Sequence, residues 1–175
     1  MSWLDNIDAA AAKKGKKVET FWQFVKFIVV SLGACIVQVV SLAILYNIPA
    51  IKDLSDTAFH FWVFDYPVIG GERCGLALFI SANVANILAQ IVAFFVNKEK
   101  TFNSGANVAI TLPIYIVFTI ALIFFSAWLS PTLNTLFLGF GWAEALARNA
   151  AMMICSALQF FLYFPVDKIL FHKKK

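Results

Sequence analysis

Carboxamide side chains recur along one long apolar stretch of this chain, residues 81–102. Four of them follow one another at intervals of three, four and seven residues: Asn83, Asn86, Gln90 and Asn97. At about 100° per residue, this spacing places them on one stripe of an α-helix. Hydrocarbon cannot hydrogen-bond an amide, so in a membrane the stripe must face other helices or a polar cavity. The amides therefore either hold helices together or line the path of a polar substrate, and the spacing favours neither role.

A ridge of small residues lies beside the amide stripe. Ala85, Ala89 and Ala93 recur every four residues and would let another helix approach closely. Four helices are few to enclose a path, so we expect a homo-oligomer. The ridge is one candidate contact between copies, although it could equally be an internal contact.

The composition identifies the class of protein. Of the 175 residues, 61% are hydrophobic and 14% are charged, and the mean hydropathy is +0.80. This apolar content exceeds that of ordinary soluble domains, and a bilayer crossing takes about 20 residues. We predict an all-α integral membrane protein with one domain, residues 24–171. A membrane-surface tail (1–23) precedes it, and a basic C-terminal tail (172–175) follows it. The expected spans are residues 27–46, 76–96, 108–129 and 145–164.

Local patterns predict what surrounds these spans. Trp3, Leu4 and Ile7 share one side of a possible short helix in the tail. The aromatic run at residues 59–64 is too short to span a bilayer and suits the headgroup region. Ser130-Pro131 is expected to end the third helix.

The distribution of charge predicts the topology. The N-terminal tail with Lys26, the second loop and the C-terminal tail hold eleven lysines. The other two loops, together with Arg148, hold three basic residues against five acidic ones. By the positive-inside rule we expect both termini to be cytoplasmic. The basic N-terminal block lacks interleaved aromatic residues and directly precedes a span, so it indicates orientation in the membrane and no nucleic-acid partner.

Polar residues also occur in the first and fourth spans. Gln38 shares a helical face with Ser31 and Ser41. Arg148 and Gln159 are eleven residues apart, which is three helical turns, so they also share a face. Arg148 lies near the outer boundary of its span, where an arginine is costly unless it reaches the interface or binds an anion.

The residue types needed for catalysis are not arranged in any recognisable pattern. The sequence shows no nucleophile with a base partner, no histidine cluster and no phosphate-binding glycine loop. His60 has no second ligand at metal-binding spacing, and the three cysteines form no C-x-x-C pair. We therefore expect no enzyme, no metal and no cofactor. An ion-coupled exporter is also disfavoured, because no Asp or Glu falls within an expected span.

The second and fourth spans end alike. Phe94-Phe95 is followed by a basic segment and Phe102, and Phe160-Phe161 is followed by a basic segment and Phe171. This similarity predicts a duplicated helical hairpin, with the two copies running in the same direction.

Three short motifs together resemble the GtrA-like family. They are Phe24-Val25-Lys26-Phe27 with Gly33, then Ala82-Asn83, and Phe95-Val96-Asn97-Lys98 with Thr101-Phe102. The chain differs from the family's usual pattern in having Lys100 before the Thr-Phe pair, Gln38 in place of an acidic residue, and Pro165-Val166-Asp167 where an asparagine is common. The family comprises small four-helix membrane proteins of cell-surface polysaccharide synthesis. The resemblance implies a flippase for undecaprenyl phosphate or another polyprenyl phosphate, or its monosaccharide-linked form, in a bacterial inner membrane.

A phosphate headgroup calls for cationic and amide donors at the membrane surface. On the cytoplasmic side these would be Lys26, Lys98, Lys100 and Asn97; on the outer side, Arg148 and Arg73. Between them, a polar path would run along Gln38, Asn83, Asn86, Gln90 and Gln159. Two alternatives stay open: the lysines could be ordinary positive-inside flanks, and the protein could be a non-catalytic auxiliary subunit of a membrane glycosyltransferase, with its amides as assembly contacts.

Overall fold

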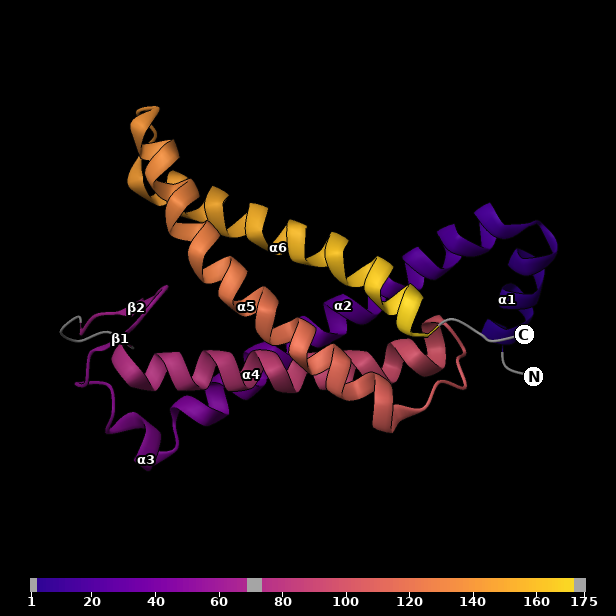
Figure 1. The fold of residues 1–175 in the computed structure, drawn as a ribbon, viewed down its shortest axis with the longest axis horizontal. Helices are drawn as coiled ribbons and strands as arrows, with labels where there is room; N and C mark the ends of the chain where they lie inside the picture. Colours follow the sequence, from indigo (N-terminus) through magenta and orange to yellow (C-terminus); the bar gives the residue numbers. More distant parts are fainter. Residues whose placement is uncertain (1–2, 69–73, 172–175) are drawn as a thin grey trace.

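The computed structural model describes residues 3–68 and 74–171. Four of the described helices are long and apolar enough to cross a membrane (Figure 1). They are α2 (Lys16–Tyr46), α4 (Gly75–Val96), α5 (Val108–Gly139) and α6 (Glu144–Leu170). The described residues are 80% helical, which confirms the predicted all-α membrane protein with four spans.

Short elements occupy the connections. They are α1 (Trp3–Lys13), α3 (Pro49–Lys52), the strands β1 (Phe59–Phe61) and β2 (Phe64–Tyr66), and a π-helical turn, η1 (Asn97–Thr101), that continues α4. The predicted tail helix is thus present as α1. The aromatic run folds as an antiparallel hairpin, and the Phe59 ring stacks on Phe79 of α4 at a centroid distance of 4.1 Å.

Two helices run past prolines at which we expected them to end. The expectation that Ser130-Pro131 ends the third helix is wrong, because α5 continues to Gly139. A proline removes one backbone hydrogen bond, and a helix tolerates that loss when the flanking turns still pair. In α5 the hydroxyl of Thr132 donates to the Trp128 carbonyl at 2.8 Å. In α6 the helix likewise passes Pro165, so Asp167 lies within it.

The spans form two hairpins. Helix α2 packs along α4, and α5 packs along α6 (Figure 1). The alanine ridge of α4 is buried, and Ala89 and Ala93 cluster with Ala34 of α2. The ridge is therefore a contact inside the chain, and it is not available as a contact between copies.

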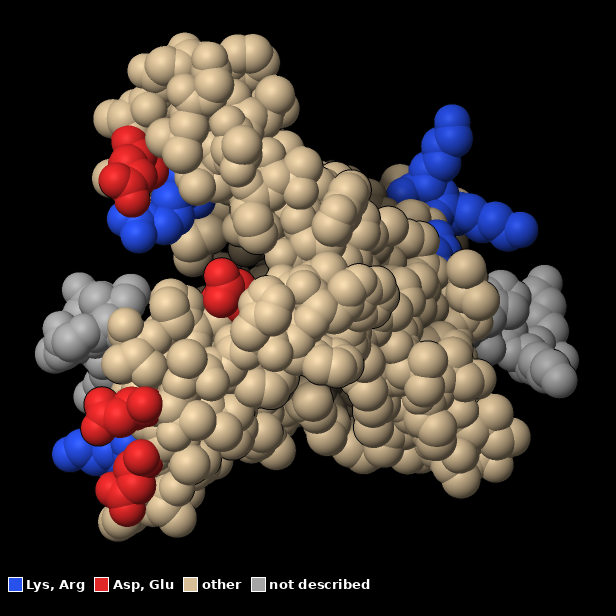
Figure 2. Space-filling view, turned by 60° about the vertical axis from the view of Figure 1, so that its left-hand side comes forward, with Lys and Arg blue, Asp and Glu red and all other residues tan. Residues whose placement is uncertain are grey.

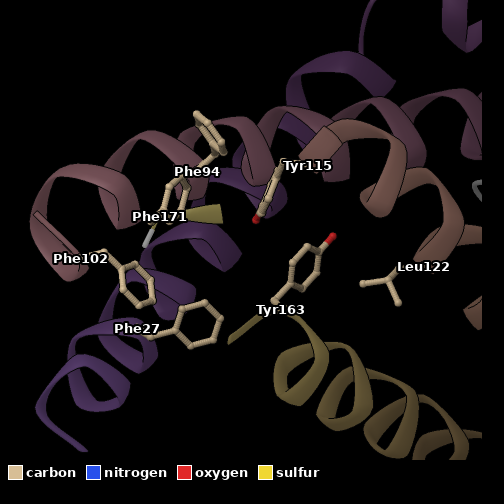
Figure 3. Packing of buried hydrophobic residues seen from close by; sticks show 7 residues of the cluster. All are labelled: Phe27, Phe94, Phe102, Tyr115, Leu122, Tyr163 and Phe171. Carbon is tan, nitrogen blue, oxygen red and sulfur yellow. The ribbon is translucent and has the colours of Figure 1, made fainter. Parts of the chain in front are cut away.

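An aromatic core joins the two hairpins (Figure 3). Phe94 of α4 lies 5.1 Å from Phe171, which directly follows α6, and Phe171 lies 5.7 Å from Phe102, measured between ring centroids. Tyr115 of α5 and Tyr163 of α6 extend the same cluster, with centroids 5.5 Å apart. Of the phenylalanines that suggested an internal duplication, Phe94, Phe102 and Phe171 meet in this core and Phe160 packs against it, whereas Phe95 and Phe161 are exposed.

Both ends of the described chain lie at one end of the molecule, which we call the basic end (Figure 1). It is formed by α1, the first turns of α2, η1 and the last turns of α6. Two contacts tie these elements together: Lys168 Nζ donates to Thr20 Oγ1, and Lys26 Nζ donates to the Lys100 carbonyl, each at 2.7 Å. The β-hairpin, α3 and the α5–α6 connection lie at the opposite end.

Candidate functional site

A cavity of about 220 Å³ lies among all four long helices. Its polar lining comes from α2, α4, α5, α6 and η1 and carries no charged side chain: Ser31, Cys35, Gln38, Gln90, Asn97, Tyr115, Ser156, Gln159 and Tyr163. We call it the amide cavity. Alanines and phenylalanines complete its wall, so its polar groups face one another in an otherwise apolar bundle.

Three predicted path residues from three different helices meet in this cavity. Gln38 of α2, Gln90 of α4 and Gln159 of α6 all line it. Gln90 Oε1 accepts a hydrogen bond from the Tyr115 hydroxyl at 2.8 Å, and Gln159 Nε2 donates to Ser126 Oγ. Each of these two amides therefore also bridges to α5, while part of its surface faces the cavity.

The predicted amide stripe of α4 divides between two surroundings. Asn83 and Asn86 are half-buried but do not line the amide cavity. Asn83 Nδ2 donates to the Phe79 carbonyl of its own helix at 2.8 Å, and its side chain also hydrogen-bonds Tyr66 of the β-hairpin. Burial raises the pKa of Tyr66, and the hydrogen bond with Asn83 opposes that rise. Because α2 and α4 cross (Figure 1), only part of the stripe faces the bundle interior.

A buried polar cluster adjoins the amide cavity at the basic end through Asn97, which also lines the cavity. Asn97, Thr101 and Asp167 are each at most 1% exposed. Asn97 Nδ2 donates to Asp167 Oδ2, and Thr101 Oγ1 donates to Asn97 Oδ1, both at 2.8 Å. The other carboxyl oxygen of Asp167 is buried without a hydrogen-bond partner among the described residues. Asn97 was expected to bind a lipid phosphate, but here its amide is paired with a carboxyl group.

Sequence reasoning did not place Asp167 or Thr101 at the site, and Asp167 was missed because the fourth span was expected to end at residue 164. A signal was present, since Val96-Asn97-Lys98 and Val166-Asp167-Lys168 match at the ends of the two hairpins. In this match Asn97 corresponds to Asp167. Their hydrogen bond joins the two hairpins where the two copies of the motif meet.

The predicted cations separate between the two ends of the molecule. Lys26, Lys98 and Lys100 lie at the basic end, where Lys26 forms an ion pair with Asp8 at 3.0 Å. Arg148 is exposed in the first turns of α6, at the opposite end. Figure 2 shows one face of the molecule, on which charged residues gather toward the two sides and the broad middle is nearly free of them. The other predicted outer cation, Arg73, lies outside the described residues.

Two hollows flank Phe102 at the basic end. The larger, about 520 Å³, lies between α1, α2 and residues 101–103, and we call it the α1 hollow. The smaller, about 320 Å³, has Lys16 and Lys168 in its wall. Lys168 was not among the predicted binding residues, although it follows Asp167 in the short match as Lys98 follows Asn97.

Within residues 3–68 and 74–171, no three His, Cys, Asp or Glu side chains group in a way that could hold a metal ion. The described cysteines Cys35, Cys74 and Cys155 form no disulfide.

Comparison of the chain with protein-family models, with curated proteins and with solved structures found no match.

Proposed function

We propose that the protein moves a polyprenyl phosphate, or its monosaccharide-linked form, across a bacterial inner membrane during cell-surface polysaccharide synthesis. The observation that carries this proposal is the meeting of Gln38, Gln90 and Gln159 in one cavity among the spans. No bond is made or broken in this function. The protein only has to lower the cost of taking a polar headgroup through hydrocarbon.

The lining of the amide cavity suits that task. Carrying an unpaired hydroxyl or phosphate into hydrocarbon costs several kcal/mol per group, because nothing there accepts or donates a hydrogen bond. Amides and hydroxyls do both, so they can hydrogen-bond a sugar or a phosphate oxygen in transit. A cavity of about 220 Å³ cannot hold an isoprenoid chain in addition to the headgroup. The tail would stay in lipid beside the exposed apolar faces of the helices.

The basic end provides the cytoplasmic entry. Lys98 and Lys100 follow α4 directly, on η1, and Lys168 lies in the last turn of α6. Their ammonium groups would attract the phosphate toward the end of the bundle from which the amide cavity leads inward. Arg148, at the opposite end of α6, would receive it on the outer side. The resemblance of the Phe95-Val96-Asn97-Lys98 motif to the GtrA-like family supports the same class of lipid.

To test this, the protein is reconstituted in liposomes that contain a fluorescent short-chain polyprenyl phosphate. Movement of this lipid between the leaflets is followed by quenching the fluorescence of the lipid in the outer leaflet. We expect Gln90→Leu and Gln159→Leu to slow movement about tenfold or more, which corresponds to about 1.4 kcal/mol of lost stabilisation in transit. Asn86→Leu is the matched control, since Asn86 is an amide of α4 that does not line the cavity. Parental rates in both glutamine variants would reject the path, and a parent protein that moves no lipid would reject the function.

An auxiliary subunit of a membrane glycosyltransferase is the second candidate. The hydrogen bonds of Gln90 with Tyr115 and of Gln159 with Ser126 favour it, because polar side chains in membrane helices often serve to hold helices together. Ser126→Ala separates the two functions, since it breaks the bond between α6 and α5, leaves the Gln159 amide in place and changes a residue that does not line the amide cavity. A transport path predicts near-parental lipid movement in Ser126→Ala. Assembly contacts predict no lipid movement by the pure protein and co-purification with a larger membrane enzyme.

A further inference from the structure

The carboxylate of Asp8 on α1 accepts hydrogen bonds from two side chains of α2. Lys26 Nζ donates to both carboxylate oxygens at 3.0 Å, and Trp22 Nε1 donates to one of them. The Lys26 side chain is only 10% exposed and that of Asp8 is 30% exposed. An ammonium and an indole N–H that converge on one anion, partly shielded from water, form an anion-binding site.

This site has no donor to spare while Asp8 is in place. A lysine ammonium has three protons to donate. Two of them serve the two oxygens of Asp8, and the Lys100 carbonyl accepts a further hydrogen bond at 2.7 Å. The carbonyl contact fixes Lys26 against η1, close to the entrance that the proposed function assigns to the basic end. A phosphate can therefore bind Lys26 fully only when Asp8 leaves.

Room for a headgroup lies directly beside this contact. The α1 hollow of about 520 Å³ has Asp8, Trp22 and Lys26 in its wall. Thr101 and Phe102 also line it, so the hollow reaches η1 next to the buried Asn97 cluster. Glu19 is the second acid in the wall. While Asp8 is in place, the hollow thus presents two carboxyl groups to an incoming phosphate.

The connection to α1 can act as a hinge. Gly15 joins α1 to α2 with a φ of +103°, a backbone conformation that glycine adopts readily and other residues rarely do. Apart from its chain neighbours, no atom lies within 4 Å of where its Cβ would be. Asp8 ties α1 to α2 through its ion pair with Lys26, and Ala11 of α1 is buried.

We propose that Trp22 and Lys26 form the cytoplasmic binding site for the phosphate headgroup, and that Asp8 occupies this site as an internal competitor. The ligand is a phosphate monoester. Its binding displaces Asp8 and frees α1 to swing about Gly15, so α1 gates the entrance. This inference rests on the proposed function and adds its regulation.

The first test measures binding of farnesyl phosphate to the full chain in nanodiscs, with inorganic phosphate as a second probe. Asp8→Asn removes the competing charge and should tighten binding about tenfold, because a site that is free only part of the time binds more weakly in proportion. Glu19→Gln is the matched control: it removes one negative charge from the same hollow without touching the Lys26 contact, and it should change affinity much less. Lys26→Gln should abolish binding.

The second test follows α1 itself by hydrogen–deuterium exchange and mass spectrometry. Exchange of the amides at residues 3–13 should rise in Asp8→Asn and in Lys26→Gln, and should stay parental in Glu19→Gln. In the parent protein, added farnesyl phosphate should produce the same rise. If only farnesyl phosphate binds and releases α1, the ligand is a lipid; if inorganic phosphate acts equally well, the same site serves a soluble phosphate.

Three results would overturn the inference, and they are distinguishable from one another. Equal tightening by Asp8→Asn and Glu19→Gln would show general electrostatics in place of displacement. Parental affinity in Asp8→Asn, with binding lost in Lys26→Gln, would reject the competitor and leave the proposed function standing. No binding of either probe by any variant would reject both.

Discussion

Replacing Asp167 by alanine should destabilise the protein measurably, because it strips the buried polar cluster of its acceptor. Asn97 Nδ2 donates to Asp167 at 2.8 Å, and both residues are at most 1% exposed, so water cannot replace the lost partner. An orphaned buried donor costs about 1–3 kcal/mol. For a chain of this size, 1 kcal/mol corresponds to a shift in melting temperature of about 2–4 °C. We therefore expect Asp167→Ala to melt about 2–12 °C lower than the parent protein.

Asp167→Asn provides the sharper comparison. Its side-chain oxygen can still accept from Asn97, and the carboxyl oxygen that its NH₂ replaces has no hydrogen-bond partner in the described part of the chain. We expect this variant to melt within about 4 °C of the parent, a difference of less than about 1 kcal/mol. Asp65→Asn, at an exposed carboxyl group in β2, is the matched surface control and should leave the melting temperature unchanged.

The assay is thermal unfolding followed by tryptophan fluorescence, with every variant in the same detergent and at one scan rate, because membrane proteins often unfold irreversibly. The double variant Asp167→Ala with Asn97→Ala should lose less stability than the two single variants together, since each single change already breaks the shared bond. The reasoning is refuted if Asp167→Ala melts like the parent, or if the two changes are strictly additive.

The remaining predictions concern packing, backbone conformation and topology. Gly75→Ala should lower the free energy of unfolding by at least about 1 kcal/mol, because Gly75 has a φ of +60° and an added Cβ would lie 2.5 Å from a backbone carbonyl oxygen. Gly33→Ala is the control: no atom lies within 4 Å of where its Cβ would be, so this variant should melt like the parent in the same assay. Ala89→Leu should separate α2 from α4 and cost about 1–3 kcal/mol, measured as a lower melting temperature. Lys52 and Lys100 are both exposed and lie at opposite ends of the molecule. An impermeant thiol reagent should therefore label Lys52→Cys and Lys100→Cys from opposite sides of the membrane, and Lys100→Cys only after the cytoplasmic side is opened. Labelling of both from one side would refute the four-span topology.

Helix and span predictions from the sequence succeeded where a local property decides the outcome. Hydropathy over about 20 residues is enough to identify a span, because hydrocarbon excludes any segment that cannot pair its own backbone. The spacing of Ala85, Ala89 and Ala93 likewise identified a close helix contact, which the structure confirms. The partner, α2 of the same chain, could not be derived, since small residues permit close approach without selecting a neighbour.

The predictions that failed concern ends and partners. The third helix passes Pro131 and the fourth passes Pro165, because one lost backbone bond is a smaller cost than ending a helix within an apolar environment. That continuation places Asp167 inside α6, where it meets Asn97 from the other hairpin. The match between Val96-Asn97-Lys98 and Val166-Asp167-Lys168 relates the two residues, but it does not show that their side chains bond, because the partners are separated by 70 positions.

The sequence by itself determined that this is a four-span membrane protein, with its lysines concentrated on one side and its amides at helical intervals, because these properties follow from the composition and period of single segments. The tertiary structure alone decided which of these groups meet. The crossing of α2 and α4 turns Gln90 and Asn97 toward the bundle interior and leaves Asn83 with the β-hairpin. The packing of α1 against α2 pairs Lys26 with Asp8. Such partners depend on the angles at which helices cross and on the turns between them, and packing over the whole chain sets both.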